Sequence, residues 1–462
     1  MRPLALSQIA RWCDARLVGD DLVVQAIGID TRTLVPGSVY VALRGESFDG
    51  HDFCAQAEAS GARALLVEHV VESALPQIVC TDSRIALARI AAELAAGRST
   101  CTIGITGSNG KTTTRTLTLG ILRCVESAAY SNPGNRNNEV GLPLALIEQP
   151  EHARFGVYEM GAGAPGDIAY LANIVRPKIA LVTNIAPAHL ERLGSLAGVA
   201  ETKGAIYDGL SGDGVAVINA DDAFAPFFVN RIGTRCRIVR YGLDATAEVW
   251  ADAIVEEDAG SRFRLHSPCG SADVSLPLSG RHQVSNALAA ATLALVAGVS
   301  LENVTHGLAR AEGVAGRQQA LTLSDGVMLL DDSYNANPGS VATAVATLVR
   351  QALRRGVPAW LALGDMRELG PGAAVLHADV GRSAKEAGVA RLFAVGPMSR
   401  HAAVAFGPGG EHFPDQESLV ERLKGQMDEP VVLLVKGSRG SRMDRIVAAL
   451  LNGAVQEGNH AA

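Results

Sequence analysis

The sequence predicts an α/β protein with three domains. At 462 residues, the chain has room for about three domains of roughly 150 residues each. Hydrophobic residues make up 48% of the chain and aromatic residues only 4%, a composition typical of parallel sheets buried under helices. Short apolar strands also alternate with helical stretches along the chain, which predicts parallel sheets joined by crossover helices.

Residues 1–82 predict a small α/β N-terminal domain. Its short strands are expected within the segments VVQAIGID, GSVYVAL and ARALLVE, with helices between them. Residues 83–98 then carry the Ala-rich segment SRIALARIAAELAAG, which predicts a helix that connects this domain to the next one.

Residues 99–313 predict a central domain built on a parallel sheet. The apolar strands TIGIT, FGVYEM and IALVTNI alternate with helical stretches. A β-rich excursion, AEVWADAIVEEDAGSRFRLHSPCGSADVSLPL, interrupts this order before an Ala-rich helix at VSNALAAATLALVAG.

Residues 314–462 predict a C-terminal Rossmann-like α/β domain. A third alternation begins here, with helices between the strands MLLDDS, AWLALGD, RLFAVG and VVLLVKG.

Charge, cysteines and hydropathy exclude several classes of protein. A formal net charge of −7 disfavours a nucleic-acid scaffold, because binding a phosphate backbone needs an excess of Lys and Arg on one face. The seven cysteines form no C-x-x-C pair, which argues for reduced thiols and against a zinc site. The chain has no apolar run of about 18 residues, and Gln8 and Arg11 interrupt the apolar stretch at its N-terminus. We therefore expect a cytoplasmic protein that does not insert into a membrane.

A phosphate-binding loop is predicted at residues 101–121, CTIGITGSNGKTTTRTLTLGI. Gly104, Gly107 and Gly110 are expected to allow positive φ and a close approach of the backbone N–H groups to an anion at the helix N-terminus. Lys111 adds a positive charge, and Thr112 stands where a P-loop hydroxyl binds Mg²⁺. The spacing is G-x-x-G-x-x-G-K-T rather than the strict P-loop pattern. Strand, turn, lysine and helix nevertheless follow one another as a phosphate site requires.

Three further side chains are candidates for chemistry at the edge of the central sheet. Glu159 ends the strand FGVYE, His189 follows the strand IALVTNI, and Lys203 lies fourteen residues later. Taken alone, Glu159 could equally cap a loop, and Lys203 would by default be a solvated helix lysine. Together with Lys111 and Thr112 they could surround a Mg-nucleotide, because Mg²⁺ prefers oxygen ligands such as those of Thr112 and Glu159.

The chain resembles a known family, the Mur ligases. The resemblance to their P-loop-type ATPase domain rests on Glu159 and on TGSNGKTTT, TNIAPAHLERLGSLAGVAETKG and GRHQVSNALAA. It extends over essentially the whole chain. Five other segments are more narrowly similar to the member that joins D-alanyl-D-alanine to UDP-N-acetylmuramoyl-tripeptide: NPGNRNNEVGLPL, EMGAGAPGDI, DDSYNANPGS, LGDMRELG and VKGSRGSRM.

The resemblance implies specific roles for residues of this chain. Lys203 matches a lysine that the family carbamylates, and His189 matches the histidine on a second Mg²⁺, so the implied catalytic group is Lys111, Glu159, His189 and Lys203. The implied Mg²⁺ ligands are Thr112, Glu159, His189 and Lys203 as its carbamate. The implied ATP-binding residues are Thr106, Gly107, Ser108, Asn109, Gly110, Lys111, Thr112, Thr113, His282, Asn286, Arg317 and Asp332.

Two substrate segments are implied in the same way. The segment IDTRTLVPGSVYVALRGESFDGHDF matches the uridine-diphosphate signature of the first domain, where the implied contacts are Thr31, Arg32, Ser47, Asp49 and His51. The chain reads Asp-Thr-Arg where the family more often has Asp-Ser-Arg, and the hydroxyl is retained. Asn135 and Asn138 fall in the segment expected to meet the peptide stem of the substrate.

The resemblance implies an ATP-dependent, Mg²⁺-requiring ligase that acts as a monomer. The terminal carboxylate of the tripeptide would take the γ-phosphoryl group of ATP, and the amine of D-Ala-D-Ala would attack the acyl phosphate. A Mur-type ligase that adds a single amino acid is the alternative, although the Asp-Asn-Pro-Arg string expected of the sister ligase is absent. The first 98 residues argue against a folylpolyglutamate synthase. A nucleotide-gated regulatory protein would be expected to lose Glu159, His189 or Lys203. Both meso-diaminopimelate and L-lysine stay open as the third stem residue.

Overall fold

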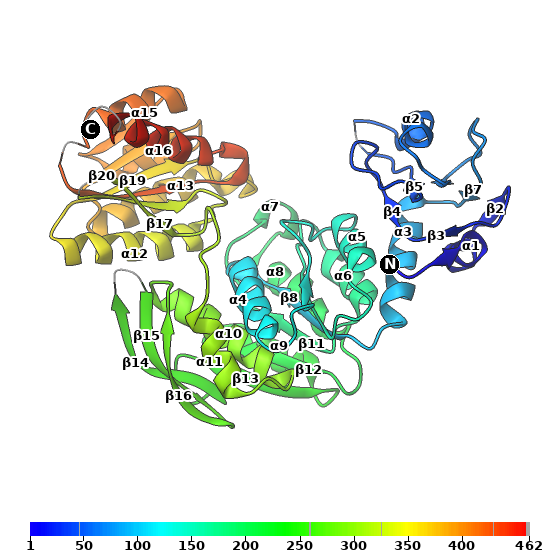
Figure 1. Cartoon of the computed structure of the whole chain (residues 1–462). Helices are drawn as coiled ribbons and strands as arrows, with labels where there is room; N and C mark the ends of the chain where they lie inside the picture. The colour runs from blue at the N-terminus through cyan, green and yellow to red at the C-terminus, as the bar shows by residue number, and fades with distance from the viewer. Residues whose placement is uncertain (46, 258–259, 325, 428, 459–462) are drawn as a thin grey trace.

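The computed structural model describes residues 1–45, 47–257, 260–324, 326–427 and 429–458. Its main sheets have five, nine and six strands and follow one another along the chain. Figure 1 shows the N-terminal part in blue on one side, the central part in cyan and green, and the C-terminal part in yellow to red on the other side. The predicted α/β class is confirmed. The boundaries at 82/83, 98/99 and 313/314 stay a prediction.

The first sheet carries the order β2-β7-β6-β5-β4, in which only β2 runs antiparallel to its neighbour. A separate antiparallel pair, β1 and β3, lies beside it in sequence. The elements of this part are β1 (Leu4–Ala5), α1 (Leu6–Cys13), β2 (Arg16–Val18), β3 (Val23–Val24), β4 (Ile27–Gly28), β5 (Val39–Val41), η1 (Gly50–Phe53), α2 (Cys54–Ala59), β6 (Ala64–Val67) and β7 (Gln77–Val79).

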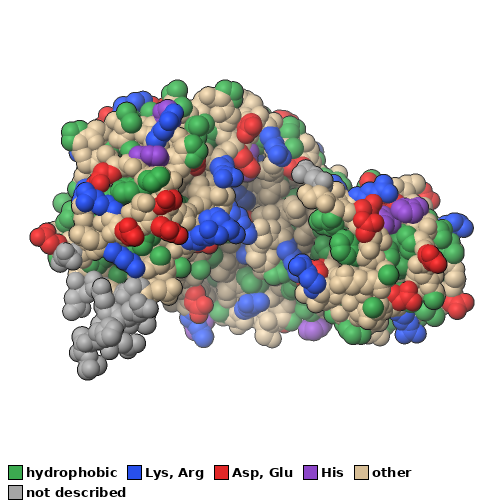
Figure 2. Space-filling view, turned by 90° about the horizontal axis from the view of Figure 1, so that it is seen from above, with side chains coloured by type: hydrophobic (Ala, Val, Ile, Leu, Met, Phe, Trp, Pro, Cys, Tyr) green, Lys and Arg blue, Asp and Glu red, His purple; other side chains and the backbone are tan. Residues whose placement is uncertain are grey.

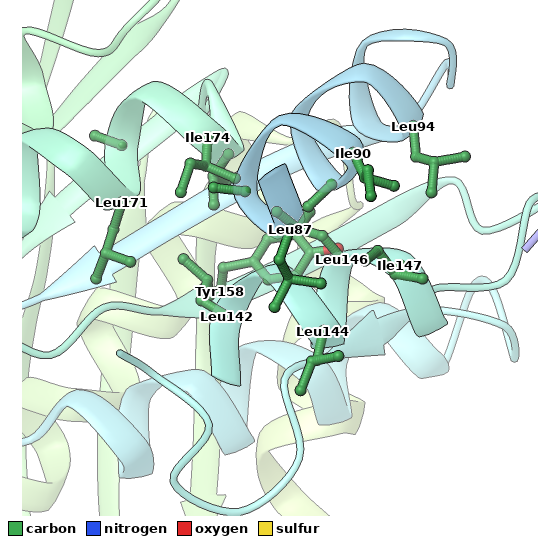
Figure 3. Packing of buried hydrophobic residues seen from close by; sticks show 14 of the residues in the cluster. Leu87, Ile90, Leu94, Leu142, Leu144, Leu146, Ile147, Tyr158, Leu171 and Ile174 are labelled. Carbon is green, nitrogen blue, oxygen red and sulfur yellow. The ribbon is translucent and has the colours of Figure 1, made fainter. Parts of the chain in front are cut away.

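The connecting helix α3 (Ser83–Ala96) forms where the sequence predicts a helix. Asp82 caps it by accepting hydrogen bonds from the backbone N–H groups of Arg84 and Ile85. Leu87, Ile90 and Leu94 of α3 belong to a buried cluster that runs from Leu4 to Ile232 and includes side chains of the central domain. Figure 3 shows them close to leucines of helix α5 (Gly141–Glu148). The N-terminal and central parts therefore share one hydrophobic core.

The central sheet has the order β16-β15-β14-β13-β12-β11-β8-β10-β9. Strands β8 to β14 are paired in parallel, and β8, β10 and β11 are the strands for which the alternating pattern predicts this. The elements are β8 (Cys101–Thr106), α4 (Lys111–Arg123), β9 (Tyr130–Ser131), β10 (Phe155–Glu159), α6 (Asp167–Val175), β11 (Ile179–Val182), α7 (Leu190–Leu193), α8 (Leu196–Gly204), η2 (Ala205–Tyr207), β12 (Val215–Asn219), α9 (Ala225–Ile232), β13 (Arg237–Gly242), β14 (Val249–Glu257), β15 (Gly260–Ser267), β16 (Gly270–Leu276), α10 (Arg281–Val296) and α11 (Leu301–Ala309).

The β-rich excursion is an extension of the central sheet. Strand β14 pairs in parallel with β13, and β15 and β16 follow it as an antiparallel meander. Phe263, Leu265 and Val274 of this meander are buried in the same cluster as the Ala-rich helix α10, so one face of the added strands is covered by that helix.

The C-terminal sheet has the order β17-β18-β22-β19-β20-β21 and is parallel except for its edge strand β17. The sequence does not predict strands β17 and β21. Buried hydrophobic residues of this part form two clusters drawn only from residues after 320. The elements are β17 (Gln319–Ser324), β18 (Val327–Asp332), α12 (Pro338–Arg355), β19 (Ala359–Gly364), η3 (Gly370–Gly372), α13 (Ala373–Glu386), β20 (Arg391–Val395), α14 (Arg400–Phe406), β21 (Gly410–Phe413), α15 (Gln416–Lys424), β22 (Val431–Lys436), η4 (Arg439–Ser441) and α16 (Asp444–Gly458).

Within the ranges that the structure describes, every helix is too short or too polar to cross a membrane.

Candidate active site

The predicted phosphate loop joins β8 to α4 and depends on two glycines with positive φ. Gly107 has a φ of 147° and Gly110 a φ of 78°. A Cβ atom on Gly107 would lie 1.8 Å from the Thr183 hydroxyl oxygen, and one on Gly110 would lie 2.4 Å from the Asn286 amide oxygen. Both positions therefore require glycine, because backbone conformation and space alike exclude a side chain.

The expectation for Gly104 is wrong. This residue lies inside β8 and its φ is not positive. A Cβ atom there would lie 3.2 Å from side-chain atoms of Met160, Pro177 and Ile206. Gly104 is therefore explained by close packing of the strand, and the loop proper begins at Gly107.

Lys111 begins α4 and reaches back over the loop. Its Nζ donates hydrogen bonds to the carbonyl oxygens of Gly107 at 2.7 Å and Ser108 at 3.3 Å. Burial lowers the pKa of Lys111, whereas the nearby charge of Glu159 opposes that shift. The side chain is therefore held at the loop where an anion would gain most from its positive charge.

Glu159 ends β10 beside the first turn of α4. It is only 3% exposed, and its Oε2 accepts a hydrogen bond from the Thr112 hydroxyl at 2.7 Å. Its Oε1 accepts a hydrogen bond from the Asn137 side chain at 2.9 Å, and Arg115 lies 3.6 Å from Oε2. The parallel pairing of β10 with β8 brings Glu159 and Thr112 together. A buried carboxylate beside a hydroxyl provides the hard oxygen donors that suit Mg²⁺.

Lys203 lies near the end of α8 and is 1% exposed, so the default of a solvated helix lysine is wrong. No described residue forms a hydrogen bond or ion pair with its amine. Burial, followed by the charge of Lys111, lowers the pKa of Lys203 well below that of an ordinary lysine. Both effects favour the neutral amine.

His189 precedes α7 and has a φ of 54°. Its Nδ1 contacts the carboxylate of Glu368, which belongs to the C-terminal domain. Burial lowers the pKa of His189 and Glu368 opposes that shift, while the charges of Lys203 and Lys111 lower the pKa further. The histidine therefore lies where the central and C-terminal domains meet.

These side chains line or adjoin a cavity of about 610 Å³ between the central and C-terminal domains. Figure 2 shows the surface hollowed between the C-terminal and N-terminal parts, with Lys and Arg side chains around the hollow. Asn337 closes one side, because its Nδ2 donates a hydrogen bond to the Asn109 side chain at 2.9 Å. Twelve residues implied by the resemblance line this cavity: Ser108, Asn109, Gly110, Lys111, Thr113, Asn138, Glu159, His189, His282, Asn286, Arg317 and Asp332.

Three residues that line the cavity carry buried polar atoms without hydrogen-bond partners among the described residues. These atoms are Nε2 of His282, Nε of Arg317 and Oε1 of Gln318. Burial, together with the charges of Arg350 and Lys436, lowers the pKa of His282 to about 4, so the ring is neutral near pH 7. The Arg317 guanidinium lies over the ring of Tyr334, 4.2 Å from its centroid. Such atoms suit a polar ligand that would supply their hydrogen bonds.

Asp332 ends β18 and pairs with the buried Lys436, whose Nζ lies 2.5 Å from its Oδ2. Burial raises the pKa of Asp332, and the charge of Lys436 opposes that shift. Lys436 thus helps keep a carboxylate ionised at the cavity wall.

Several implied residues lie outside the cavity lining. Thr106 is buried beneath the loop, where its hydroxyl donates to the Met160 carbonyl oxygen. Asn135 is exposed. Three others are close to lining residues: Gly107, Thr112 and Lys203. The remaining ones belong to the first domain: Thr31, Arg32, Ser47, Asp49 and His51.

Some of the implied uridine-diphosphate contacts of the first domain form hydrogen bonds or ion pairs with each other or with neighbouring side chains. The Asp49 carboxylate accepts a hydrogen bond from the His51 backbone N–H at 3.0 Å and pairs with Arg44 at 2.9 Å. Hydrogen bonds from His51 hold the pKa of Asp49 at about 2. Arg32 pairs with Asp30. These residues follow β4 and β5, so they lie at the carboxyl ends of two parallel strands, where α/β sheets bind ligands.

Sequence reasoning missed several side chains of this region, among them Asn137, Gln318, Glu368 and Lys436. Asn137, Gln318 and Lys436 line the cavity, and Glu368 contacts His189. A signal was available for three of them, because they occur in the segments NPGNRNNEVGLPL, LGDMRELG and VKGSRGSRM. Gln318 gives only a weak signal, as the neighbour of Arg317.

Comparison with known proteins agrees with this arrangement. The chain matches the family descriptions "Mur ligase family, catalytic domain" over residues 23–95, "Mur ligase middle domain" over residues 105–294 and "Mur ligase, glutamate ligase domain" over residues 316–439. It is 41% identical over 453 residues to the UDP-N-acetylmuramoyl-tripeptide--D-alanyl-D-alanine ligase of Escherichia coli strain K12, which covers 97% of this chain and 99% of that protein.

Solved structures agree as well. MurF from Acinetobacter baumannii superimposes with a TM-score of 0.92 at 31% identity, covering 98% of this chain and 99% of that one. MurF ligase from Thermotoga maritima, solved in complex with ADP, gives a TM-score of 0.83 at 25% identity, covering 94% of this chain and 99% of that one. The chain belongs to the Mur ligase family.

Proposed function

We propose that this protein is an ATP-dependent ligase that joins D-alanyl-D-alanine to UDP-N-acetylmuramoyl-tripeptide, giving the UDP-N-acetylmuramoyl-pentapeptide, ADP and phosphate. One observation carries the proposal. The phosphate loop, the Thr112–Glu159 pair and the side chains of Arg317 and Asp332 meet at a single cavity. Full-length similarity to ligases named for this reaction supports the choice of substrates.

The reaction has two steps. A carboxylate is a poor electrophile, so an oxygen of the tripeptide's terminal carboxylate first attacks the γ-phosphorus of ATP and ADP leaves. The amine of D-Ala-D-Ala then attacks the carbonyl carbon of the acyl phosphate, the C–O bond to phosphate breaks, and an amide forms. Phosphoryl transfer needs positioning and charge neutralisation more than covalent help from the protein. No nucleophilic side chain is required.

The cavity residues take the following roles. Backbone N–H groups after Gly107 and the N-terminus of α4 hold the phosphates, and Lys111 neutralises charge on the transferred group. Arg317 approaches from the C-terminal domain, and Asp332 accepts hydrogen bonds from the ribose hydroxyls. His282 and Asn286 bind the adenine side. Thr31, Arg32, Ser47, Asp49 and His51 hold the uridine diphosphate on the first domain, while Asn135 and Asn138 meet the peptide stem.

The residues present fit Mg²⁺. Thr112 and Glu159 offer two oxygen donors within hydrogen-bonding distance of each other, and His189 lies on the same cavity. When bound, Mg²⁺ supplies neutralisation of the phosphate charge.

Lys203 completes this site as a carbamate. The neutral amine attacks the carbon of CO₂, an N–C bond forms and one proton is released, so a buried cation becomes an anion with oxygen donors. The depressed pKa of Lys203 and its lack of a partner among the described residues support this role.

We further propose that the protein acts as a monomer in the cytoplasm, where it supplies peptidoglycan precursor for cell-wall growth, cell shape and division. The direct test is a panel assay. The enzyme is incubated with ATP, Mg²⁺, D-Ala-D-Ala and UDP-muramoyl peptides that carry meso-diaminopimelate or L-lysine as third residue, and products are read by mass. Release of phosphate only when both acceptor and dipeptide are present supports the ligase. Slow ATP hydrolysis regardless of these substrates would favour a regulatory protein instead.

Arg317→Ala is expected to lower kcat by about 10–100-fold, because a hydrogen bond to a charged group contributes about 1.5–3 kcal/mol. Binding of the sugar nucleotide, measured by calorimetry, should be unchanged because the first domain holds it. The matched control is Arg400→Ala, which removes an exposed arginine from α14 of the same domain. Unchanged turnover by Arg317→Ala would show that Arg317 is not part of the nucleotide site.

A further inference from the structure

One loop of the C-terminal domain rests on α7 of the central domain. The carboxylate of Glu368 contacts Nδ1 of His189. The backbone carbonyl of Glu368 accepts a hydrogen bond from the Glu191 N–H at 3.3 Å, and a Cβ atom on Gly370 would lie 3.4 Å from the Glu191 Cα. Glu368 therefore meets α7 through both its side chain and its backbone.

Both partners have an unusual backbone conformation. His189 has a φ of 54° and Glu368 a φ of 63°, a region in which residues other than glycine are uncommon. Such conformations persist where the surrounding structure holds them, and they cluster at functional sites. Here two of them lie opposite each other across a domain boundary.

The contact assigns different tasks to the two imidazole nitrogens. Nδ1 of His189 is occupied by the Glu368 carboxylate, so Nε2 is the nitrogen left for a ligand in the cavity that His189 lines. A carboxylate that accepts the Nδ1 proton fixes the tautomer and the orientation of a histidine ring, and it raises the basicity of the other nitrogen.

We propose that Glu368 is a positioning residue that acts across the domain boundary: by accepting a hydrogen bond from His189 Nδ1, it holds Nε2 ready to bind a divalent cation when the C-terminal domain docks. This inference rests on the proposed function. Glu368 and His189 belong to different domains. The docking of the C-terminal domain therefore also orients the His189 ring. The central domain alone lacks the carboxylate.

A simpler role for Glu368 would be to hold the two domains together. The chain offers a matched control for that role, because Glu256 of the central domain forms another ion pair across the same boundary, 3.2 Å from Arg350. Neither Glu256 nor Arg350 lines the cavity. Loss of that pair tests the effect of removing one interdomain contact without touching His189.

The experiment compares the full-length wild type with Glu368→Gln, Glu368→Ala and Glu256→Gln. Mn²⁺ affinity is measured by electron paramagnetic resonance with a non-hydrolysable ATP analogue, kcat and KM are measured in the ligase assay, and the His189 tautomer is read from ¹⁵N-histidine spectra. We expect Glu368→Ala to lower Mn²⁺ affinity and kcat by about 10-fold or more and to change the tautomer signal of His189. Glu368→Gln keeps an acceptor oxygen and should fall between Glu368→Ala and the wild type. Glu256→Gln should stay within about twofold of the wild type in Mn²⁺ affinity and should leave the His189 tautomer signal unchanged, because neither Glu256 nor Arg350 lines the cavity.

Equal losses in Glu368→Ala and Glu256→Gln would overturn the inference in favour of simple domain docking. Unchanged Mn²⁺ affinity and tautomer signal in Glu368→Ala would also overturn it. If the proposed function is wrong, the wild type itself will show no ligase turnover. That result does not depend on the residue at position 368, so it is distinguishable from failure of the inference about Glu368.

Discussion

Lys111→Ala is expected to lower turnover by about 10²–10³-fold or more, the largest effect of any single substitution at this site. Among the described residues, the Nζ of Lys111 donates to two loop carbonyls, those of Gly107 and Ser108, so its removal costs the fold only these two hydrogen bonds. In the phosphoryl-transfer step the same amine would neutralise charge that develops in a site shielded from solvent. Steady-state kinetics and thermal unfolding of the same preparation check the prediction: kcat should collapse, whereas the melting temperature should change little.

Lys178→Ala serves as the control for that experiment. Lys178 is exposed and lies outside the cavity lining, so the same substitution should leave both turnover and melting temperature unchanged. Near-normal product formation by Lys111→Ala would remove the interpretation of this segment as a phosphate site.

Lys203→Met is expected to abolish most activity, by about 10²-fold or more, without destabilising the fold. An oxygen donor near a divalent cation supplies several kcal/mol of transition-state stabilisation, and methionine cannot supply it. The unmodified amine has a lowered pKa in the folded state, so burial disfavours folding at every pH below the pKa of an unfolded lysine, and this cost disappears above that pKa. Methionine has a similar volume and no charge, so near pH 7 and without CO₂ the variant should unfold at an equal or higher temperature.

The carbamate itself is observed by ¹³C NMR. Wild-type protein with nucleotide and ¹³C-bicarbonate should give a carbamate signal that Lys203→Met lacks. The ligands must be bound, because the modification can be incomplete without them. A wild-type spectrum without that signal, or full activity in Lys203→Met, would contradict the role of Lys203.

The parts of this protein that depend on local sequence could be predicted, and the family with them. Apolar strands, the Ala-rich helix α3 and the glycines at 107 and 110 depend on patterns within a few residues. The comparisons confirm the family that these segments and the longer motifs indicate. The assigned roles of the site residues stay predictions that the experiments above test.

Features that depend on distant parts of the chain could not be predicted. Gly104 has the spacing of a loop glycine but lies in β8. The side chains of Met160, Pro177 and Ile206, which come from three other segments, fill the space beside it. The surroundings of Lys203 arise only when α8 packs against α6, α7 and η2. Glu368 meets His189 across 179 residues of chain, and no local pattern encodes that contact.

The hydrophobic clusters divide the chain into parts that can unfold separately. The cluster from Leu4 to Ile232 crosses α3, whereas the clusters of the last domain draw on no residue before 320. Segments that share a buried cluster tend to unfold as one cooperative unit, and separate clusters allow separate units. In rising denaturant, the last domain can therefore detach or melt while the first two stay folded, and the cavity disappears at that step. Enzymatic activity should then vanish at a lower denaturant concentration than most of the helical circular dichroism signal.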